Sequence, residues 1–407
     1  MSGREREVLV AELGAAGDGV ARAEEGRIFV PLALPGERWR VRLERRLREG
    51  WAASALACLE PGPRAEPCCP HFGRCGGCRL QHLPDSLYRS QRRDRIVAAL
   101  AHRGLPGESV EEVRVVPLAS RRRLRLALAR GPRGLILGFR QRESHRLVSV
   151  SVCPVARPEL VALLPRLAAG LGGALARPEP GEVSLTVTDS GIDLLLRPHR
   201  RLDLDLDRRE ALVALAESAD LARLSWGDRA TAEPVVVRRA PLLLFGEIRI
   251  DPPPGVFLQA TKRAEQAMRA AVSEWAGGAS RLVDLFAGIG ALTLGRPGKL
   301  ALFESDPPAV AAIDAARRRL AAGSVTVERR DLFRNPLTAA ELDAFDAVVL
   351  DPPRAGATAQ SGELARSKVP RVIYGSCDPG SFARDARTLQ DGGYRLEKLL
   401  PIDQFLW

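Results

Sequence analysis

From residue 261 onward the chain alternates short apolar runs with amphipathic stretches, and this rhythm restricts the fold more than any other feature. The apolar runs predict strands at 281–286, 300–304, 325–329, 344–350, 371–374 and 394–400. The amphipathic stretches predict helices at 261–275 and 307–322, and a glycine loop after 286 predicts the start of another helix. This order is typical of a parallel, doubly wound α/β sheet, in which ligands bind outside the carboxyl ends of the strands.

Two of these strand ends carry residues suited to catalysis. One strand runs into 351–354 (Asp-Pro-Pro-Arg), and a second runs into 376–379 (Ser-Cys-Asp-Pro). Many methyltransferases place an acidic Pro-Pro motif where the methyl-accepting atom binds. A thiolate that adds to C6 of uracil makes C5 nucleophilic, so Cys377 near Asp351 favours uracil as the methyl acceptor. A buried cysteine would be inert instead.

The segment 284–290 (Asp-Leu-Phe-Ala-Gly-Ile-Gly) has the features of a cofactor loop. Glycines such as Gly288 let the backbone approach a ligand closely. Glu304 ends the next strand, where a ribose-binding carboxylate belongs, and Asp331 after the third strand is placed to contact an adenine. The third glycine of a dinucleotide fingerprint is missing. Because no pyrophosphate then needs to be held, the loop favours S-adenosylmethionine over NAD.

Four of the seven cysteines lie within eleven residues, which in a cytoplasmic protein indicates a metal site or catalysis rather than disulfides. Cys69, Cys75 and Cys78 follow C-x5-C-x2-C spacing, and Cys153 is the best candidate for a fourth ligand. Four sulfurs suit tetrahedral zinc or a [4Fe–4S] cluster. The spacing leaves both open, and it also leaves open Cys68 in place of Cys69.

Turn residues and changes of pattern divide the chain into four predicted parts. Residues 1–60 read as a small β-barrel of short strands, and 61–95 form the cysteine-rich segment that Cys153 completes. Residues 96–250 mix strands and helices as an α+β domain, which we expect to bind RNA. Residues 251–407 form the Rossmann-like class I methyltransferase domain. The expected fold is therefore multidomain, with an OB-like barrel, an α+β centre and an α/β end.

The net charge of +11 comes almost entirely from arginine, which suits phosphate and bases. An RNA partner is plausible, although codon bias in a GC-rich genome explains an arginine- and alanine-rich chain equally well. No apolar run reaches the roughly 18 residues that span a bilayer, and 1–10 is charged rather than signal-like. We expect a cytoplasmic monomer with no membrane contact.

Taken together, the motifs resemble the RNA (uracil-5-)methyltransferases, and the resemblance covers nearly the whole chain. It is closest to the branch that acts on 23S ribosomal RNA and carries an N-terminal TRAM barrel and an iron–sulfur cluster; the transfer-RNA branch of bacteria generally lacks both, which makes transfer RNA the less favoured substrate. The motifs that carry the resemblance lie at 34–37, 69–82, 138–140, 153–154, 257–259, 284–290, 351–356, 376–379 and 384–385.

The resemblance implies a role for each site residue. Cys377 would be the nucleophile. The S-adenosylmethionine site would be lined by Gln259, Phe286, Gly288, Glu304, Asp331 and Asp351. The family pattern favours a [4Fe–4S] cluster over zinc, held by Cys69, Cys75, Cys78 and Cys153.

The chain also departs from the family pattern. Asp378 stands where the family usually has asparagine, and Ala291 replaces a further polar cofactor contact. The family continues past 403–405 (Asp-Gln-Phe) into a His-x-Glu segment and a last strand, whereas this sequence stops at Trp407. That glutamate is the base that removes the C5 proton, and a general base contributes about 10²–10⁴-fold. We expect a truncated copy of a longer protein or a degenerate paralogue.

Three hypotheses follow. The first is methylation of uridine at C5 in structured RNA, with 23S ribosomal RNA as the expected substrate and the target base flipped out of its stack. The second is a non-catalytic or turnover-deficient RNA-binding protein of the same fold. The third is a redox or iron sensor built on the cysteine cluster.

Overall fold

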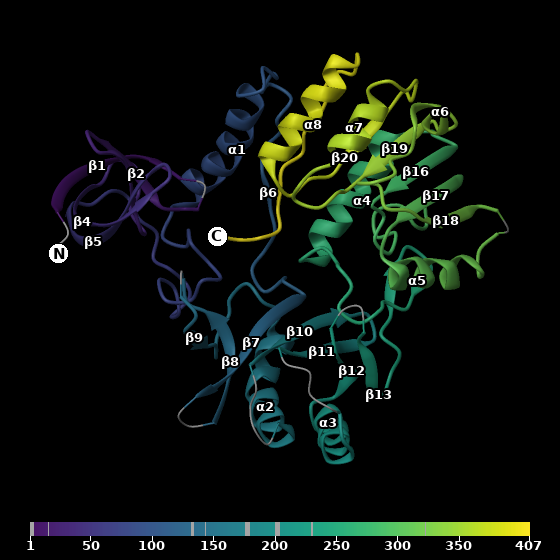
Figure 1. Ribbon diagram of the computed structural model, residues 1–407, viewed down its shortest axis with the longest axis horizontal. Helices are drawn as coiled ribbons and strands as arrows, with labels where there is room; N and C mark the ends of the chain where they lie inside the picture. The colour runs from purple at the N-terminus through teal and green to yellow at the C-terminus, as the bar shows by residue number, and fades with distance from the viewer. Residues whose placement is uncertain are drawn as a thin grey trace. The chain divides into compact units, whose positions relative to one another are not determined.

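The computed structural model describes residues 4–14, 16–131, 134–142, 144–175, 180–199, 204–228, 231–321 and 323–407 (Figure 1). These residues form two compact units. Unit 1 comprises Met1–Arg92, Phe139–Pro154 and Leu406–Trp407, and unit 2 comprises Arg93–Gly138 and Val155–Phe405. Within the described ranges, no helix is long and apolar enough to cross a membrane.

Unit 1 contains a closed barrel with strand order β1-β2-β3-β5-β4, which confirms the predicted N-terminal barrel. Its strands are Glu5–Leu13 (β1), Gly19–Ala23 (β2), Gly26–Val30 (β3), Arg38–Leu47 (β4) and Gly50–Glu60 (β5). Alternate apolar residues such as Ile28 and Val30 point into the barrel and are buried. At the closure of β3 on β5, a Cβ atom on Gly50 would lie 2.0 Å from the carbonyl oxygen of Arg27, so only glycine fits there.

The rest of unit 1 is the cysteine-rich segment, the first part of helix α1 (Asp85–Ala101) and strand β9 (Leu147–Ser149). A β-bridge joins Cys75 to Gln141, and the backbone N–H of Gly76 donates to the carbonyl oxygen of Arg140 at 2.9 Å. These backbone contacts bring the segment 69–78 to the segment 139–154, which carries Cys153. Two cysteine stretches that are far apart in the sequence are therefore held together.

Unit 2 begins with a mixed sheet in the order β13-β12-β11-β10-β7-β8. Its strands are Arg123–Gly131 (β7), Gly134–Arg140 (β8), Gly181–Thr188 (β10), Gly191–Pro198 (β11), Leu221–Trp226 (β12) and Glu233–Val237 (β13). Helices α2 (Pro158–Ala174) and α3 (Leu206–Ser218) pack together below this sheet in Figure 1. The buried residues of α2, Leu160, Leu163, Leu164, Leu167 and Leu171, recur every three or four positions and form one apolar stripe.

The remaining part of unit 2 is a parallel sheet in the order β18-β17-β16-β19-β20, which confirms the doubly wound α/β prediction. Its strands are Arg281–Leu285 (β16), Lys299–Glu304 (β17), Val325–Arg329 (β18), Ala347–Leu350 (β19) and Val372–Tyr374 (β20). The chain builds outward from β16 to β18 and then returns to place β19 on the other side of β16. The carboxyl ends of β16 and β19 are therefore the topological switch point, where α/β sheets bind their ligands.

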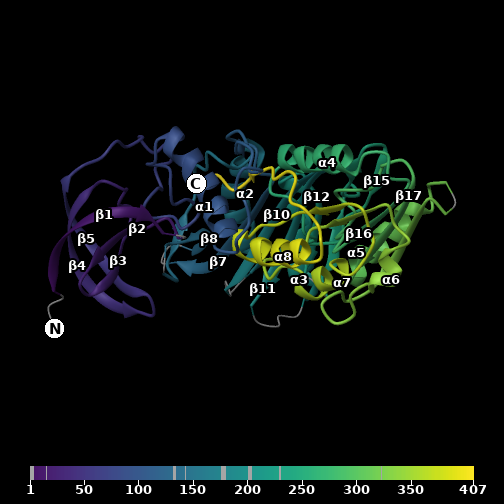
Figure 2. The same ribbon diagram turned by 90° about the horizontal axis from the view of Figure 1, so that it is seen from above.

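Both faces of the parallel sheet are covered by helices. One face packs against α4 (Lys262–Ala276) and α5 (Pro307–Arg317), and the opposite face packs against α6 (Ala339–Leu342), α7 (Thr358–Leu364) and α8 (Pro379–Asp391). Figure 2 shows α4 on one side of β16 and α6 and α7 on the other. Along β19, Val349 contributes to the first core and Val348 to the second, and such double burial explains its continuous apolar run.

Short elements complete unit 2. They are β6 (Arg114–Val115), which pairs with β21 (Ile402–Asp403), and the hairpin of β14 (Leu243–Phe245) and β15 (Ile248–Ile250).

Two predicted elements are wrong. Residues 394–400 are not a strand; Leu396 and Leu399 pack instead against the core that includes Leu100 and Ala383, which satisfies their apolar alternation outside the sheet. The expected helix after the glycine loop is a series of turns, because the chain adopts positive φ repeatedly, with Gly288 at 58° among these positions. The four-part domain division stays a prediction.

A buried ion pair joins the mixed sheet of unit 2 to helix α4. The Arg122 guanidinium bonds to the Glu265 carboxylate, and the two side chains are 3% and 4% exposed. Arg122 Nε also donates to the carbonyl oxygen of Gln259 at 3.1 Å, and its backbone N–H donates to the carbonyl oxygen of Ala260 at 2.9 Å. Arg122 therefore fixes the backbone position of Gln259.

Replacing Arg122 with methionine should leave the Glu265 charge buried and unpaired, which typically costs about 3–5 kcal/mol of unfolding free energy. Urea denaturation of Arg122→Met measures this loss. The double variant Arg122→Met/Glu265→Met removes both charges and should recover most of the stability. A single variant with the wild-type urea midpoint would contradict the assigned importance of the pair.

Candidate active site

Asp284 lies at the carboxyl end of β16 and is 2% exposed. The Thr293 hydroxyl donates to Asp284 Oδ2 at 2.5 Å. Burial raises the pKa of Asp284 to about 7, opposed by the Thr293 hydrogen bond and supported by the charges of Asp351 and Glu304. These three carboxylates therefore share one region of the switch point.

The cofactor loop leaves β16 through backbone conformations that suit a close ligand contact. Phe286 has φ 59° and Gly288 has φ 58°. A Cβ atom on Gly288 would meet no atom of the described structure within 4 Å, so the backbone there faces open space. The Gly288 N–H donates to Glu304 Oε2 at 2.8 Å, and the backbone N–H groups of Ser305 and Asp306 donate to the other Glu304 oxygen at 2.7 and 2.9 Å. Backbone donors thus hold the Glu304 carboxylate beside the loop.

The loop after β18 brings Asp331 toward the same region. Asp331 Oδ1 accepts from the backbone N–H of Phe333 at 3.1 Å. Phe333 is 51% exposed, and the centroid of its ring lies 5.3 Å from that of Phe286. Two aromatic rings at the mouth of a switch point suit a flat heterocycle such as adenine.

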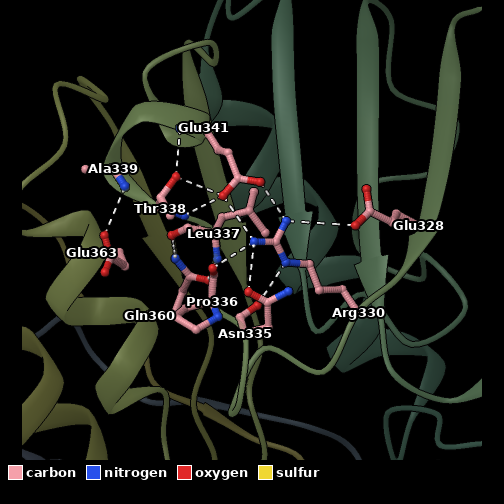
Figure 3. A network of polar contacts seen from close by, with 10 residues as sticks. All are labelled: Glu328, Arg330, Asn335, Pro336, Leu337, Thr338, Ala339, Glu341, Gln360 and Glu363. Carbon is pink, nitrogen blue, oxygen red and sulfur yellow. Dashed lines mark hydrogen bonds and ion pairs between the residues drawn. The ribbon is translucent and has the colours of Figure 1, made fainter.

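Arg330 anchors this loop, as Figure 3 shows. Its guanidinium donates to the Glu341 carboxylate at 2.7 Å and to the backbone carbonyl oxygens of Asn335 and Pro336 at 2.9 Å each. Glu341 in turn completes a capping box with Thr338 at the start of α6. The side-chain amide of buried Gln360 on α7 bonds both backbone groups of Leu337. The loop 331–337 is therefore tied to α6 and α7.

Asp351 follows β19 and faces Gln259. Gln259 Nε2 donates to Asp351 Oδ2 at 3.0 Å, and Gln259 is 5% exposed. Burial raises the pKa of Asp351 to about 6, and the Gln259 hydrogen bond opposes that rise. A Cβ atom on Gly375, at the end of the neighbouring strand, would lie 2.8 Å from Asp351 Oδ1, so glycine is needed there to make room for the carboxylate.

Cys377 lies two residues beyond Gly375 and is exposed. Partial burial and the charge of Asp351 raise the pKa of the Cys377 thiol, and Arg354 opposes the rise. The Asp378 side chain caps α8 by accepting from the Ser381 N–H at 2.9 Å, a role that asparagine fills equally well. The departure from the family pattern at Asp378 therefore keeps the local structure.

Asp385 on α8 fixes the loop that joins Asp351 to α7. Its carboxylate is fully buried and accepts from the Ala357 N–H at 2.6 Å and from the Tyr374 hydroxyl at 2.7 Å. Arg384 Nε donates to it at 2.8 Å, and the same guanidinium donates to the carbonyl oxygen of Ala355 at 2.8 Å. The loop that carries Arg354 is thus held against the strand that leads to Cys377.

The structure brings the predicted site residues to one end of the parallel sheet. The residues in question are Gln259, Phe286, Gly288, Glu304, Asp331, Asp351 and Cys377. Sequence reasoning missed Thr293, Arg330, Gly375 and Gln404, which act on these residues through hydrogen bonds or by leaving space. Gly375 directly before Ser376 was the one available signal, because a glycine at a strand end indicates close approach of another group.

The four predicted metal ligands lie together in unit 1. Burial raises the pKa of the Cys78 thiol to about 11, and the charges of Cys153, Cys75 and Cys69 add to the rise. No group of three or more His, Cys, Asp or Glu positioned to hold a metal ion occurs among the residues that the structure describes. The thiols are thus near enough to repel one another as thiolates but are not arranged as a closed ligand set.

Gln81 lies beside these thiols. Its side chain forms a hydrogen bond with the Cys78 thiol that lowers the thiol pKa, against the larger rise that burial causes. The Gln81 carbonyl oxygen meanwhile accepts from the Cys69 N–H at 3.1 Å. An amide side chain that bonds to clustered thiols fits a group with acceptor sulfurs, and a metal cation would turn the repulsion between thiolates into binding.

The parallel sheet, its glycine loop and its carboxylates define a Rossmann-like methyltransferase fold. The family model described as "tRNA (Uracil-5-)-methyltransferase" matches residues 310–407, and the model described as "TRAM domain" matches residues 1–49. An uncharacterized RNA methyltransferase of Brucella suis is 42% identical over 417 residues, covering 100% of this chain and 96% of the relative. The 23S rRNA (uracil(1939)-C(5))-methyltransferase RlmD of Pectobacterium atrosepticum is 34% identical over 420 residues, covering 98% of this chain and 90% of the relative.

A solved structure shares the whole fold. The Pyrococcus abyssi tRNA (uracil-54, C5)-methyltransferase, in complex with S-adenosyl-L-homocysteine, has a TM-score of 0.72 and 21% sequence identity, with 98% of this chain and 96% of that chain covered. The chain belongs to the RNA (uracil-5-)methyltransferase family. It is an S-adenosylmethionine-dependent RNA methyltransferase with a TRAM domain.

Replacing Arg330 with glutamine should loosen the 331–337 loop and lower the unfolding free energy by about 1 kcal/mol, the scale of a partly exposed ion pair. The Arg330 guanidinium holds the pKa of Glu341 down, at about 2. The stabilisation from this ion pair is therefore complete above the ordinary pKa of a glutamate carboxyl group, and it is lost as pH falls toward 2. The stability gap between the variant and the wild type should accordingly shrink in acid.

Thermal unfolding at pH 7 and at pH 3 measures this gap. Arg329→Gln, one residue earlier on β18, is the matched control and should change stability less. An equal gap at both pH values would show that Arg330 does not act through Glu341.

Proposed function

We propose that the chain transfers a methyl group to C5 of a uridine in structured RNA through a covalent bond between Cys377 and C6 of the base. The observation that carries the proposal is the placement of an exposed cysteine beside Asp351 at the switch point. A nucleophile is not needed for methyl transfer to nitrogen or oxygen, so its presence next to the acidic Pro-Pro motif favours carbon as the acceptor.

Cys377 starts the proposed reaction. Its thiolate forms a bond to C6 of the uracil, and the electron pair of the C5–C6 double bond moves to make C5 nucleophilic. S-adenosylmethionine would supply the methyl group: as C5 bonds to the methyl carbon, the bond from that carbon to the sulfonium sulfur would break and S-adenosylhomocysteine would leave. The C5 proton passes to a base from solvent, the C5–C6 double bond re-forms, and the Cys377 thiolate leaves. Arg354 favours the thiolate, because its positive charge opposes the rise in the thiol pKa.

The cofactor would bind across the carboxyl ends of the sheet. Gly288 leaves open space above the backbone, and Glu304 offers a carboxylate suited to a ribose diol. Phe286 and Phe333 would flank the adenine, with Asp331 at its edge. Asp351 would lie nearest the methyl group, because it adjoins Cys377, and Gln259 is hydrogen-bonded to Asp351.

Ribosomal RNA is the proposed substrate. The RlmD relative that covers 98% of this chain is named for a uridine of 23S ribosomal RNA. The arginine-rich composition and the TRAM barrel suit a large folded RNA better than a small ligand. We expect the protein to act on this RNA in the cytoplasm as a monomer.

We also propose that Cys69, Cys75, Cys78 and Cys153 hold a [4Fe–4S] cluster, with Gln81 as a donor to its sulfur atoms. The clustered thiols and the hydrogen bond between the Gln81 side chain and the Cys78 thiol support this assignment. Four thiolates from two distant segments would then stabilise unit 1, since metal binding is coupled to folding.

Replacing Cys377 with alanine should lower methyl transfer at least about 10³-fold, because C5 is then not activated. The measurement uses S-adenosylmethionine with a labelled methyl group, total RNA and digestion to nucleosides. The label should appear in 5-methyluridine. Cys58→Ala, in β5 of the barrel, is the matched control and should keep activity.

Label in any other nucleoside, or full activity of Cys377→Ala, would contradict the proposal. RNA binding in a gel shift without methylation would support a non-catalytic RNA-binding protein instead.

Protein purified without oxygen should be brown and contain about four iron and four acid-labile sulfide ions per chain. Cys153→Ser should lose this iron, whereas Cys68→Ser should keep it, because Cys69 is the assigned ligand. Bound zinc, or iron retained by Cys153→Ser, would contradict the cluster assignment.

A further inference from the structure

A line of three hydrogen bonds runs from the backbone of Ala260 to Asp351. The Ala260 N–H donates to Gln404 Oε1 at 2.8 Å. Gln404 Nε2 donates to Gln259 Oε1 at 2.7 Å. Gln259 Nε2 then donates to Asp351 Oδ2 at 3.0 Å. Gln404 directly follows β21, so the end of unit 2 reaches the side chains at the switch point.

The backbone at Ala260 fixes the direction of every bond in this line. A backbone N–H can only donate, so it must face the oxygen of the Gln404 amide. The NH₂ group of Gln404 then faces Gln259, which must offer its own oxygen. Gln259 is left with its NH₂ group toward Asp351. An amide alone could present either atom to a carboxyl group, and Gln404 removes that choice.

The direction of the hydrogen bond between Gln259 and Asp351 decides which protonation state of Asp351 is favoured. An amide NH₂ donates to a carboxylate, whereas an amide oxygen would accept from the protonated acid. Burial already raises the pKa of Asp351 to about 6, and the Gln259 bond limits that rise. Among the described residues, Asp284 on β16 and Cys377 beyond β20 interact with the Asp351 charge. Glu304 acts on Asp284, and Arg354 acts on Cys377.

We propose that Gln404 is a positioning residue that sets the amide orientation of Gln259 and so keeps Asp351 as a carboxylate during methyl transfer. A carboxylate attracts the positive sulfonium of the methyl donor, and a carboxylic acid does not. The inference rests on the proposed methylation of uridine by Cys377.

Gln404→Leu tests the role without adding charge. The Gln259 amide loses its fixed orientation, so the pKa of Asp351 should rise and the acid limb of the pH–rate profile should move to higher pH. A shift of about half to one pH unit is expected, with the rate near pH 9 close to the wild-type rate.

Gln404→Glu keeps the acceptor for Ala260 but forces the amide of Gln259 to turn, so the acid limb of this variant should move further than that of Gln404→Leu.

The Cys377 thiol gives a readout that needs neither RNA nor activity. The charge of Asp351 raises the thiol pKa, so a protonated Asp351 makes Cys377 more reactive. At pH 7, iodoacetamide should alkylate Cys377 about two- to threefold faster in Gln404→Leu than in the wild type, as measured by peptide mass spectrometry. Gln390→Leu on α8 is the matched control and should leave both readouts unchanged.

A rate that falls by the same factor at every pH would show that Gln404 is merely structural and would overturn the proposal. An acid limb that moves in Gln404→Glu but not in Gln404→Leu would overturn it as well, because charge alone would then explain the effect. If the wild type does not methylate uridine, the proposed function fails, and the alkylation rates still decide the role of Gln404.

Discussion

The buried ion pair between Arg122 and Glu265 is the contact on which the candidate active site depends. Arg122 lies just before β7 of the mixed sheet, and its carbonyl oxygen accepts from the Val187 N–H at 2.8 Å on β10 of that sheet. Its side chain and N–H bind the backbone at Gln259 and Ala260. A charge pair so deeply buried costs more to break than to keep. The backbone of Gln259 is therefore fixed in position, and its side-chain amide extends from there to Asp351 at the parallel sheet.

The chemistry of the site follows from burial of acids at a single edge. Asp284 and Asp351 end adjacent strands, and burial raises the pKa of each. Each also receives one hydrogen bond that favours its charged form, from Thr293 and from Gln259. A region of this kind can bind a cation such as a sulfonium, and it can adjust the reactivity of the neighbouring Cys377 thiol.

The sequence was sufficient to predict the parts of the fold that depend on local patterns. The barrel, the parallel sheet and the positions of Asp284, Glu304, Asp351 and Cys377 at strand ends all follow from alternation and turn residues. The strand predicted at 394–400 was wrong because alternation of apolar residues does not show which surface a segment packs on. Here the segment packs on the core that includes Leu100 and Ala383 rather than in the sheet. Arg330 and Gln404 were missed because their partners lie on other elements, and only the folded chain shows which ones.

The most direct test of the central claim is covalent trapping by an RNA fragment that contains 5-fluorouridine at the target position. Fluorine at C5 cannot leave as a proton does, so the bond between Cys377 and C6 should persist after methyl transfer. The account predicts a complex that survives denaturing electrophoresis, with the nucleotide mapped to Cys377 by mass spectrometry. Methylation of ordinary uridine without any such complex, or a complex at another residue, would contradict it.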